Sequence, residues 1–517
     1  MATNNNLLTK RPFVKILPLT NKGEMTQNPL AMRGESPVLQ NWVVIPQEQF
    51  LSELYVSGHK INNPLLYPDK IRFLDTDEIK KINGGTGCYV KEKVARYSIC
   101  LQSIILIKSL ASLLGNPLHF TDGNLTPSDE QKLTLQEWQQ SWISDNMEEN
   151  FFQAVKSERS TGDCAMAFWI KGKDYGCKIF SFLNGDHLFP HYDDYGRLSK
   201  FVRQYSEMDE EGTTIVTKIE IYDDKYVTTF TKNDAKGANK VADKLKSIIK
   251  KLSDNKNEYN YNIDGYTQDG DAVPHGFDAI PVVYHRDMFG ACWTPVQDNI
   301  DDYEMSMSLL CENNKAYAFP IIVLLGAEAN IQGGTDGRPY AITSPDSNAK
   351  VDLLTHGDAS ESFKLQLDTM LKNILMGSFT VIPPEVKSGD LPGVAIKLIY
   401  APSLEKAMAD AKEWNPFVDD MVKLYTFARK TAMNKRDYDT ISVHGEILPY
   451  VHQNTAETVT LICKAVTAGV LSIETALEHN PFSAPDEKSR VLREEVSNEL
   501  NNTKESLIPN PDNTNIS

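Results

Sequence analysis

Residues 295–325 have the sequence PVQDNIDDYEMSMSLLCENNKAYAFPIIVLL. From Val296 onward, apolar residues recur every three or four positions, which places them on one face of a helix. These positions are Val296, Ile300, Tyr303, Met307, Leu310 and Tyr317, with Asn314 as the polar exception. The opposite face carries Asp298, Asp301, Asp302, Glu304, Glu312 and Lys315. A helix of about 25 residues would be roughly 37 Å long, and Pro320 would end it.

A small β unit and a second helix are expected next. Residues 321–325 and 351–354 are apolar and typical of strands, and turn residues dominate positions 326–347 between them. From Ser360 a second apolar stripe comprises Phe363, Leu367, Met370, Leu371, Ile374 and Leu375. One interpretation is that the first stripe packs on its own domain, as amphipathic helices usually do. However, little of its own domain flanks the thin hairpin, which favours burial against neighbouring subunits of a ring.

This order of elements is similar to the stem and clip of tailed-bacteriophage portal proteins, the head-to-tail connectors. The resemblance begins with Ile280-Pro281-Val282-Val283 and a turn at Gly290, and continues with the acidic helix, the β excursion and the return helix. In that family the return helix leads into a loop lining the DNA tunnel, and then into a helix that often opens with a Ser-Gly-Val-Ala-like phrase. Residues 383–397 here read PPEVKSGDLPGVAIK, so the phrase is interrupted.

The region before the long helix changes from helical to strand periodicity. Helices are expected at 94–114 and 133–157, and strands at 165–170, 178–182, 197–205, 215–222 and 226–231. A turn at Pro190-His191-Tyr192-Asp193 and a strand with Glu220-Ile221-Tyr222 follow the order of the portal wing. Residues 232–261 are rich in Lys and Asn with interspersed acids, which predicts a solvated surface insertion.

The region after the hairpin is expected to be helical. A helix at 402–432 has the inward residues Leu404, Met408, Ala411, Trp414, Phe417, Val418, Met421, Leu424, Tyr425 and Ala428. Pro416 inside this pattern predicts a bend near Trp414. Asn454 and Glu457 indicate a capping-box start for a further helix. The phrases at 468–477 and 480–482 are similar to the portal crown, so the resemblance spans roughly residues 45–500.

We therefore predict an α+β chain with the portal-protein fold: a wing, a long-helix stem, a small β clip, a kinked tunnel helix and a helical C-terminal crown. The expected divisions are an N-terminal arm (1–40), ordered only against a neighbour, the α+β wing (41–292), the first stem helix (293–320), the clip (321–359), the second stem helix (360–378), the tunnel loop (379–393), the kinked tunnel helix with its return to the wing (394–450), the crown (451–500) and a flexible tail (501–517).

The composition is that of a large globular chain with an acidic balance. Its 517 residues allow two to four domains, and its formal net charge is −17. A protein that grips nucleic acid needs Lys and Arg to release counterions from phosphates, so this charge argues against a gripping protein. It suits a conduit through which DNA slides. No apolar run approaches the ~20 residues of a membrane span and the start lacks a signal-peptide core, so we expect no membrane and synthesis in the host cytoplasm.

The resemblance implies three sets of functional residues. The DNA-facing tunnel loop would include Glu385, Val386, Lys387, Ser388, Gly389 and Asp390, with Lys387 as the phosphate contact. The channel and stem would use Asp298, Asp301, Asp302, Glu312, Lys364 and Lys372. The clip would meet partners through Gly333, Gly334, Asp336, Arg338 and Tyr340.

The resemblance also implies the function. A portal protein forms a twelve-subunit ring at one capsid vertex of the virion, where double-stranded DNA enters during packaging and leaves during ejection. Its implied partners are the major capsid protein, the terminase, and then head-completion or adaptor proteins and tail proteins. The terminase would hydrolyse ATP, so no cofactor is expected in this chain.

Other functional classes have weaker support. The chain has no Gly-x-Ser-x-Gly phrase and no phosphate loop ending in Lys-Ser or Lys-Thr, so we expect no catalytic residues and no enzyme. Cys164, Cys177, His187 and His191 suggest zinc, but Pro190 between the histidines and the strand-like cysteine segments favour structural packing, so no metal is expected. A metal-dependent hydrolase using acidic clusters, or a non-portal structural capsid protein, remain the alternatives.

Overall fold

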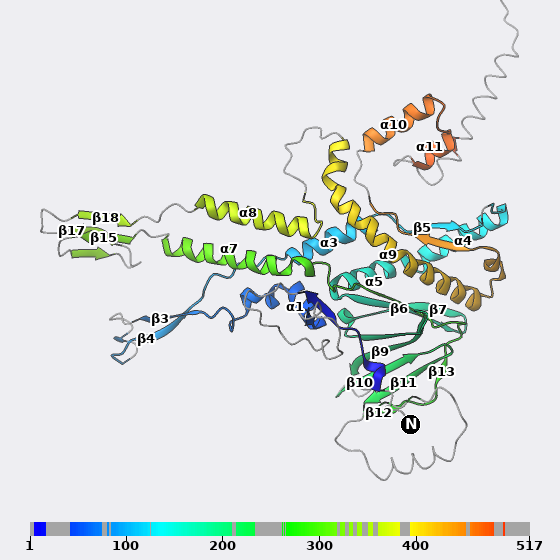
Figure 1. Ribbon diagram of the computed structural model, residues 1–517, viewed down its shortest axis with the longest axis horizontal. Helices are drawn as coiled ribbons and strands as arrows, with labels where there is room; N and C mark the ends of the chain where they lie inside the picture. The colour runs from blue at the N-terminus through cyan, green and yellow to red at the C-terminus, as the bar shows by residue number, and fades with distance from the viewer. Residues whose placement is uncertain are drawn as a thin grey trace, which may run out of the picture. The chain divides into compact units, whose positions relative to one another are not determined.

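The computed structural model describes residues 5–16, 42–74, 80–81, 84–124, 126–208, 214–232, 261, 263, 265–317, 321–325, 330–333, 339–343, 350–354, 360–382, 393–450, 455–479 and 490–491. The chain divides into two compact units. The first comprises Met1–Thr380 and Lys406–Pro449, and the second comprises Val381–Glu405 and Tyr450–Ser517. The described elements mix helices and strands, in agreement with the α+β class (Figure 1).

The two largest antiparallel sheets of the described residues lie in the first unit. One has the strand order β14-β6-β7, formed by Val282–Arg286, Asp163–Lys171 and Asp174–Ser181. The other has the order β12-β11-β10-β9-β8, formed by Tyr266–Gln268, Tyr226–Lys232, Ile215–Tyr222, Leu198–Met208 and His187–Tyr192, and β13 (Val273–Pro274) pairs with β11. Buried residues of both sheets, including Ala165, Phe180, Leu188 and Phe201, form one cluster. The sheets are therefore packed on each other.

The strands predicted from period-two patterns are confirmed within a few residues, but the predicted turn at Pro190-His191-Tyr192 is wrong. These residues belong to β8, where Pro190 is paired with Phe201 of β9. A proline is tolerated there because β8 is the last strand of its sheet, where an edge position needs no ladder donor. The chain turns later, between Asp193 and Gly196, whose φ is 79°.

The large core of the first unit lies between several helices and the strands β6 and β14. It brings together α3 (Leu101–Leu114), α4 (Asp129–Ser144), α5 (Met147–Thr161) and α9 (Gly393–Met433). Its largest buried side chains include Trp138, Trp142, Phe151, Trp414 and Tyr425. For Trp414 and Tyr425 this burial was predicted from the helical spacing.

The single helix predicted at 133–157 is two helices in the structure. Asn146 has a left-handed backbone with a φ of 53°, which ends α4 and starts α5 in a new direction. Asp145 beside it accepts hydrogen bonds from the hydroxyls of Tyr175, at 2.5 Å, and Tyr425, at 2.7 Å. The break is thus stabilised by two residues distant in sequence, which helical periodicity does not reveal.

Helix α9 begins nine residues before the predicted start at Pro402, and it continues through Pro402. Within the first unit, the predicted inward face is largely confirmed, but Met408 is 51% exposed and Asp410 is buried instead. The bend predicted near Trp414 stays a prediction.

Part of the expected N-terminal arm packs on its own chain. Leu7, in η1 (Asn5–Leu8), is buried with Val202 and Ile219 of the larger sheet, and its carbonyl oxygen lies 2.9 Å from Nε2 of His191. Strand β1 (Phe13–Ile16) pairs with β2 (Trp42–Ile45). The expectation that the arm orders only against a neighbour is therefore wrong for residues 5–16, because Leu7 packs on the larger sheet and Phe13 is buried in the helical core.

The predicted helix–β–helix unit is present. Helix α7 (Gln297–Tyr317) follows a short 3-10 turn, η7 (Thr294–Val296), and α8 (Ser360–Gly377) lies beside α7 (Figure 1). The predicted strands β15 (Ile321–Leu325) and β18 (Lys350–Leu354) pair antiparallel. A second pair, β16 (Asn330–Gly333) and β17 (Pro339–Thr343), occupies the region predicted as turns. These strands are four and five residues long, so turn residues around them dominate the pattern.

The described part of the second unit is helical. It contains the first residues of α9, then α10 (Thr455–Thr467) and α11 (Ile473–His479). Gly469, with a φ of 69°, follows α10, and Val470 donates its amide hydrogen back to the carbonyl of Ala465. The expected capping residue Asn454 lies outside the described residues. Among the described helices, none is both long and apolar enough to cross a membrane.

Candidate functional site

The predicted apolar stripes of α7 and α8 pack into one core of their own chain, whereas the sequence favoured burial against neighbouring subunits. Ile300 and Ile374 are fully buried, and Leu367, Met370 and Leu371 of α8 pack against the same core. Near the base, a Cβ on Gly377 would lie 2.9 Å from Cγ1 of Val296, so the end of α8 lies close to η7, the turn that precedes α7. Each helix therefore buries its apolar stripe largely against its own chain.

A second side of α7 is covered by an extended segment, residues 95–99, which we call the strap. The amide of Ala95 donates to Oε1 of Glu312 at 2.5 Å, that of Tyr97 to Oγ of Ser308 at 2.8 Å, and that of Ile99 to Oε1 of Glu304 at 2.8 Å. Four residues along a helix rise about 6 Å, and two residues along an extended chain rise about 6.6 Å, so the two repeats match.

The strap explains why the helix predicted at 94–114 begins at Leu101. The amides of Ala95, Tyr97 and Ile99 donate to α7 side chains, so they are not available for a helical ladder. It also corrects the expectation that little of its own domain flanks α7. The acidic side chains of α7 supply the acceptors for a neighbouring segment of the same chain.

Glu304 lies at the centre of this arrangement, although the helical pattern placed it on a solvated face. It is 1% exposed, and its Oε1 lies 2.7 Å from Nδ1 of His59. Nε2 of His59 lies 2.9 Å from the carbonyl oxygen of Glu53. Both partners are acceptors, so the imidazole makes both bonds as a donor when it is protonated on both nitrogens. Burial lowers the pKa of His59, but the hydrogen bond and charge of Glu304 outweigh burial and raise it.

Glu53 joins the same buried cluster from α1 (Gln47–Leu54). Its Oε2 accepts a hydrogen bond from Nε1 of Trp293 at 3.0 Å, and burial raises the pKa of the carboxyl group. Trp293 is fully buried and precedes η7. The base of α7 is therefore held by polar groups of α1 and of the turn after it. Sequence reasoning missed this cluster, because its members are 245 residues apart along the chain.

The residues predicted for the channel and stem fall into two groups. Asp301 forms an ion pair with Lys60 at 2.6 Å, and Glu312 forms one with Lys70 at 2.7 Å. The hydrogen bonds from Lys70 and from the Ala95 amide lower the pKa of Glu312 to about 2. Asp298, Asp302, Lys364 and Lys372 have exposed side chains.

Most of the residues predicted for the tunnel loop and the clip lie outside the described part of the chain. Glu385–Asp390 of the expected tunnel loop, and Gly334, Asp336 and Arg338 of the expected clip, lie outside the described residues. Gly333 is at the end of β16, where the register with β17 shifts and Gly333 faces Pro339. Tyr340 is in β17.

A buried ionic network lies below the hairpin and was not predicted. Nη2 of Arg159 in α5 lies 2.7 Å from Oδ2 of Asp410 in α9, and Lys406 pairs with the other oxygen of Asp410. Arg159 and Asp410 are 4% and 5% exposed, and the Arg159 carbonyl accepts the amide of Cys292. The network thus joins α5, α9 and the turn before α7. Asp410 shares the helical register of Ala407, Ala411 and Trp414, and a charge in an apolar register is the signal that could have found it.

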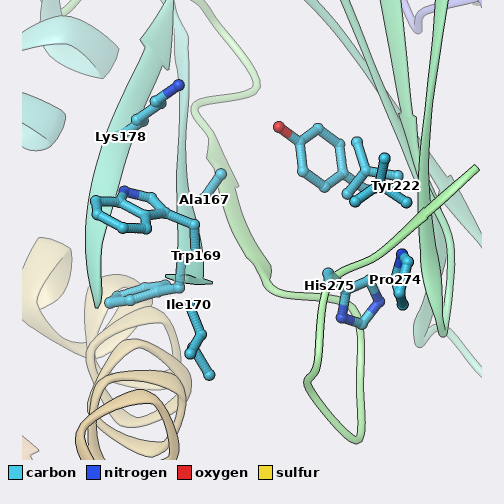
Figure 2. A pocket seen from close by; sticks show the side chains of 10 residues that line it. Ala167, Trp169, Ile170, Lys178, Tyr222, Pro274 and His275 are labelled. Atoms are coloured by element: carbon cyan, nitrogen blue, oxygen red, sulfur yellow. The ribbon is translucent and has the colours of Figure 1, made fainter. Parts of the chain in front are cut away.

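A cleft of about 400 Å³ lies between the two sheets. Trp169, Ile170 and Lys178 line one side, and Tyr222, Pro274 and His275 line the other (Figure 2). The Tyr222 hydroxyl donates to Oε2 of Glu220 at 3.0 Å. Nδ1 of His275 accepts the amide of Phe277 and Nε2 donates to the carbonyl of Asp223, while burial lowers the pKa of this histidine. These bonds fix His275 as a neutral structural group.

The residues considered for zinc lie in the same sheets. Cys164 is in β6 and faces Ser181, Cys177 is in β7 and faces Phe168, and both histidines are in β8. Burial raises the pKa of both thiols, that of Cys177 to about 12. Over the residues that the structure describes, no three His, Cys, Asp or Glu side chains gather closely enough to hold a metal ion.

Comparison with known protein families agrees with this arrangement. Residues 51–501 match the family described as phage portal protein, SPP1 Gp6-like. No curated protein matches the chain. The family match covers the sheets, the hairpin α7–α8, the small strand pairs, and helices α9 to α11. The chain therefore belongs to the phage portal protein family.

Proposed function

We propose that this chain forms a closed ring at one vertex of a phage capsid and that double-stranded DNA passes through the ring during packaging and ejection. The observation that carries the proposal is the unit of two packed helices joined through two small strand pairs, within a chain matched to the portal family over residues 51–501. No catalytic role is proposed. The ring would be a structural conduit, and a terminase that docks on it would supply the energy for packaging.

Each part of the unit has a proposed role. Helices α7 and α8 form the stem, and β15–β18 with β16–β17 form the clip that meets the terminase and then the head-completion, adaptor and tail proteins. Gly333, Arg338 and Tyr340 are proposed clip contacts. The loop before α9 faces DNA, with Lys387 as its phosphate contact. The two sheets and the helical core form the wing, which the major capsid protein surrounds, and α10 and α11 belong to the crown.

The charge distribution supports a sliding conduit. The net charge of −17 leaves few sites where phosphates would be held, since attachment to DNA comes from clustered Lys and Arg. On α7, Asp301 and Glu312 are paired with lysines of the same chain, and Asp298 and Asp302 are exposed. We propose that Asp298 and Asp302 of α7, with Lys364 and Lys372 of α8, are exposed stem charges that face DNA or a neighbouring subunit.

Electron imaging of the purified full-length chain tests the proposal. We expect class averages viewed down the particle axis to show closed rings, twelvefold in the assembled virion, with a central channel wide enough for a DNA duplex. Monomers in dilute solution are compatible with this function only if rings form when capsid protein is added. Sheets, shells or filaments without a closed ring under both conditions would contradict the proposed function and favour a different structural role in the capsid.

A further inference from the structure

A two-stranded ribbon of the first unit has an uncovered aromatic face. It consists of β3 (Lys70–Leu74) and β4 (Cys88–Glu92), paired antiparallel with Phe73 opposite Tyr89 and Ile71 opposite Lys91 (Figure 1). Ile71, Phe73 and Tyr89 are 68%, 52% and 76% exposed, and the rings of Phe73 and Tyr89 lie 4.9 Å apart. An isolated two-stranded ribbon is at best marginally stable in water, so this face needs a cover.

The ribbon is basic, in contrast to the rest of the chain. Together with the next residue, Lys93, its strands contain four bases and one acid, Glu92, whereas the whole chain has a net charge of −17. The bases are Lys70, Arg72, Lys91 and Lys93. A surface that covers the ribbon should therefore be acidic and should also offer an apolar contact for its aromatic rings.

Helix α7 has such a surface on its third side. One side packs on α8 through residues such as Ile300, and another side receives the strap through Glu304, Ser308 and Glu312. The remaining side carries Asp298, Asp302 and Leu309, spaced by four and seven residues, which we call the acidic stripe. All three side chains are exposed, Leu309 to 54%.

We propose that the ribbon of one subunit docks on the acidic stripe of α7 in the next subunit, a contact that rests on the proposed ring. The four steps along each strand span about 14 Å, and the eleven steps from Asp298 to Leu309 span about 16 Å, so the two surfaces are similar in length. Lys91 pairs with Asp302 across the contact, and Phe73 and Tyr89 cover Leu309.

The geometry of this contact has a consequence for assembly. Ribbon and stripe are different surfaces of the same chain, so the contact is head-to-tail and leaves one ribbon and one stripe free on every open end. Such a contact continues from subunit to subunit until a ring closes. The salt bridge of Lys70 to Glu312 within each subunit fixes the base of the ribbon beside its own α7, which limits the positions that its free face can reach.

Charge exchange tests the contact. Lys91→Glu and Asp302→Lys should each raise the protein concentration needed for half-maximal assembly by about tenfold or more, because each places like charges opposite each other. The double variant should return to within about twofold of wild type, because it restores an opposite-charge pair. Lys173→Glu is the matched control, since Lys173 is an exposed lysine in the turn between β6 and β7. Mass photometry measures assembly, and thermal unfolding checks that each variant is folded.

A cross-linking experiment separates this proposal from the proposed function. Two differently tagged chains carry Tyr89→Cys and Leu309→Cys, each with Cys88→Ser and Cys311→Ser to remove nearby native thiols. A disulfide between the two tags on mild oxidation would establish the contact between subunits, and Tyr195→Cys paired with Leu309→Cys should give none. Closed rings without the disulfide, and with unchanged assembly of Lys91→Glu, would overturn the ribbon proposal and leave the ring intact.

The remaining outcomes also decide between the two proposals. The disulfide without any closed ring would support the ribbon contact and contradict the ring. Neither a ring nor a disulfide would overturn both. If Lys91→Glu leaves assembly unchanged but weakens binding of a duplex oligonucleotide, the ribbon covers nucleic acid instead, and the proposal is wrong.

Discussion

At the scale of single residues, Glu304 links α7 to two other segments of the chain, His59 and the strap. One carboxylate oxygen lies within hydrogen-bonding distance of the His59 imidazole and of the Ile99 amide, and Ser308 donates to the Glu304 carbonyl one turn further along. The carboxylate is almost fully buried, so its charge depends on the cationic form of His59 for compensation. The attachment of the strap and of the 3-10 turns after α1 to α7 is therefore coupled to one proton.

Glu304→Gln is expected to destabilise the chain in a pH-dependent way. The substitution retains an acceptor for the Ile99 amide but removes the charge that raises the pKa of His59, at a cost of roughly 3–5 kcal/mol. Because the folded-state pKa is raised, the stabilisation is complete below the ordinary histidine value of about 6.5 and is lost as pH rises through the raised pKa. The difference in unfolding midpoint between wild type and variant should therefore be largest near pH 6 and smaller near pH 9.

Glu312→Gln provides the control for this experiment. Glu312 accepts the same kind of strap hydrogen bond, but its cation is a lysine and its pKa is lowered to about 2. The stabilisation by the Glu312 carboxylate is lost only as pH falls toward that value, so the effect of Glu312→Gln on the unfolding midpoint should not change between pH 6 and pH 9. An effect of Glu304→Gln that is equally constant over this range would contradict the role given to His59.

At the scale of elements, the base of α7 depends on two glycines at a close approach. Gly162, after α5, and Gly290, before η7, both have left-handed backbones, with φ values of 88° and 93°. A Cβ on Gly162 would lie 2.8 Å from the Cα of Gly290, and a Cβ on Gly290 would lie 2.2 Å from Cζ of Phe50 in α1. The end of α5, the turn before α7 and helix α1 can meet because neither glycine has a side chain.

Gly290→Ala is expected to destabilise the base of α7 more than backbone strain alone would. The left-handed conformation costs an alanine about 1–2 kcal/mol, and displacing the buried Phe50 ring adds roughly 1–3 kcal/mol. Gly185→Ala is a matched control, because its φ is 85° but no atom lies within 4 Å of the added Cβ. Chemical denaturation of both variants isolates the packing contribution. An equal loss of unfolding free energy in the two variants would show that the Phe50 ring moves away from the added Cβ at little cost.

The elements also show where periodicity misled the sequence interpretation. The apolar pattern of residues 94–100 continues smoothly into α3, yet their amides bond to α7 side chains. The pattern at 133–157 continues across Asp145 and Asn146, yet the chain changes direction there. In both cases local propensity permits a helix, and hydrogen-bond partners from distant segments decide otherwise.

At the scale of the whole molecule, the acidic balance should dominate contact with free DNA. With 70 acidic against 53 basic residues, the chain should bind duplex oligonucleotides more weakly than about 1 μM at physiological salt, and more weakly still as salt rises from about 50 to 200 mM. Fluorescence anisotropy measures this binding, with a basic DNA-binding protein of similar size as the positive control. Nanomolar binding that resists salt would contradict the sliding conduit.

Elements with a strong local signal can be predicted from the amino-acid pattern alone. The apolar steps of three and four residues in α7 and α8, and the period of two in β6, β7, β9, β10 and β11, specify which face of each element is buried, and the order of these elements carried the resemblance to portal proteins. The polar contacts at the base of α7, among them His59 with Glu304, the strap, and Arg159 with Asp410, depend instead on how the chain folds in three dimensions. The two differ because apolar burial is non-directional and repeats with the helix or strand period, whereas a buried polar contact needs one particular partner atom that can lie anywhere along the chain.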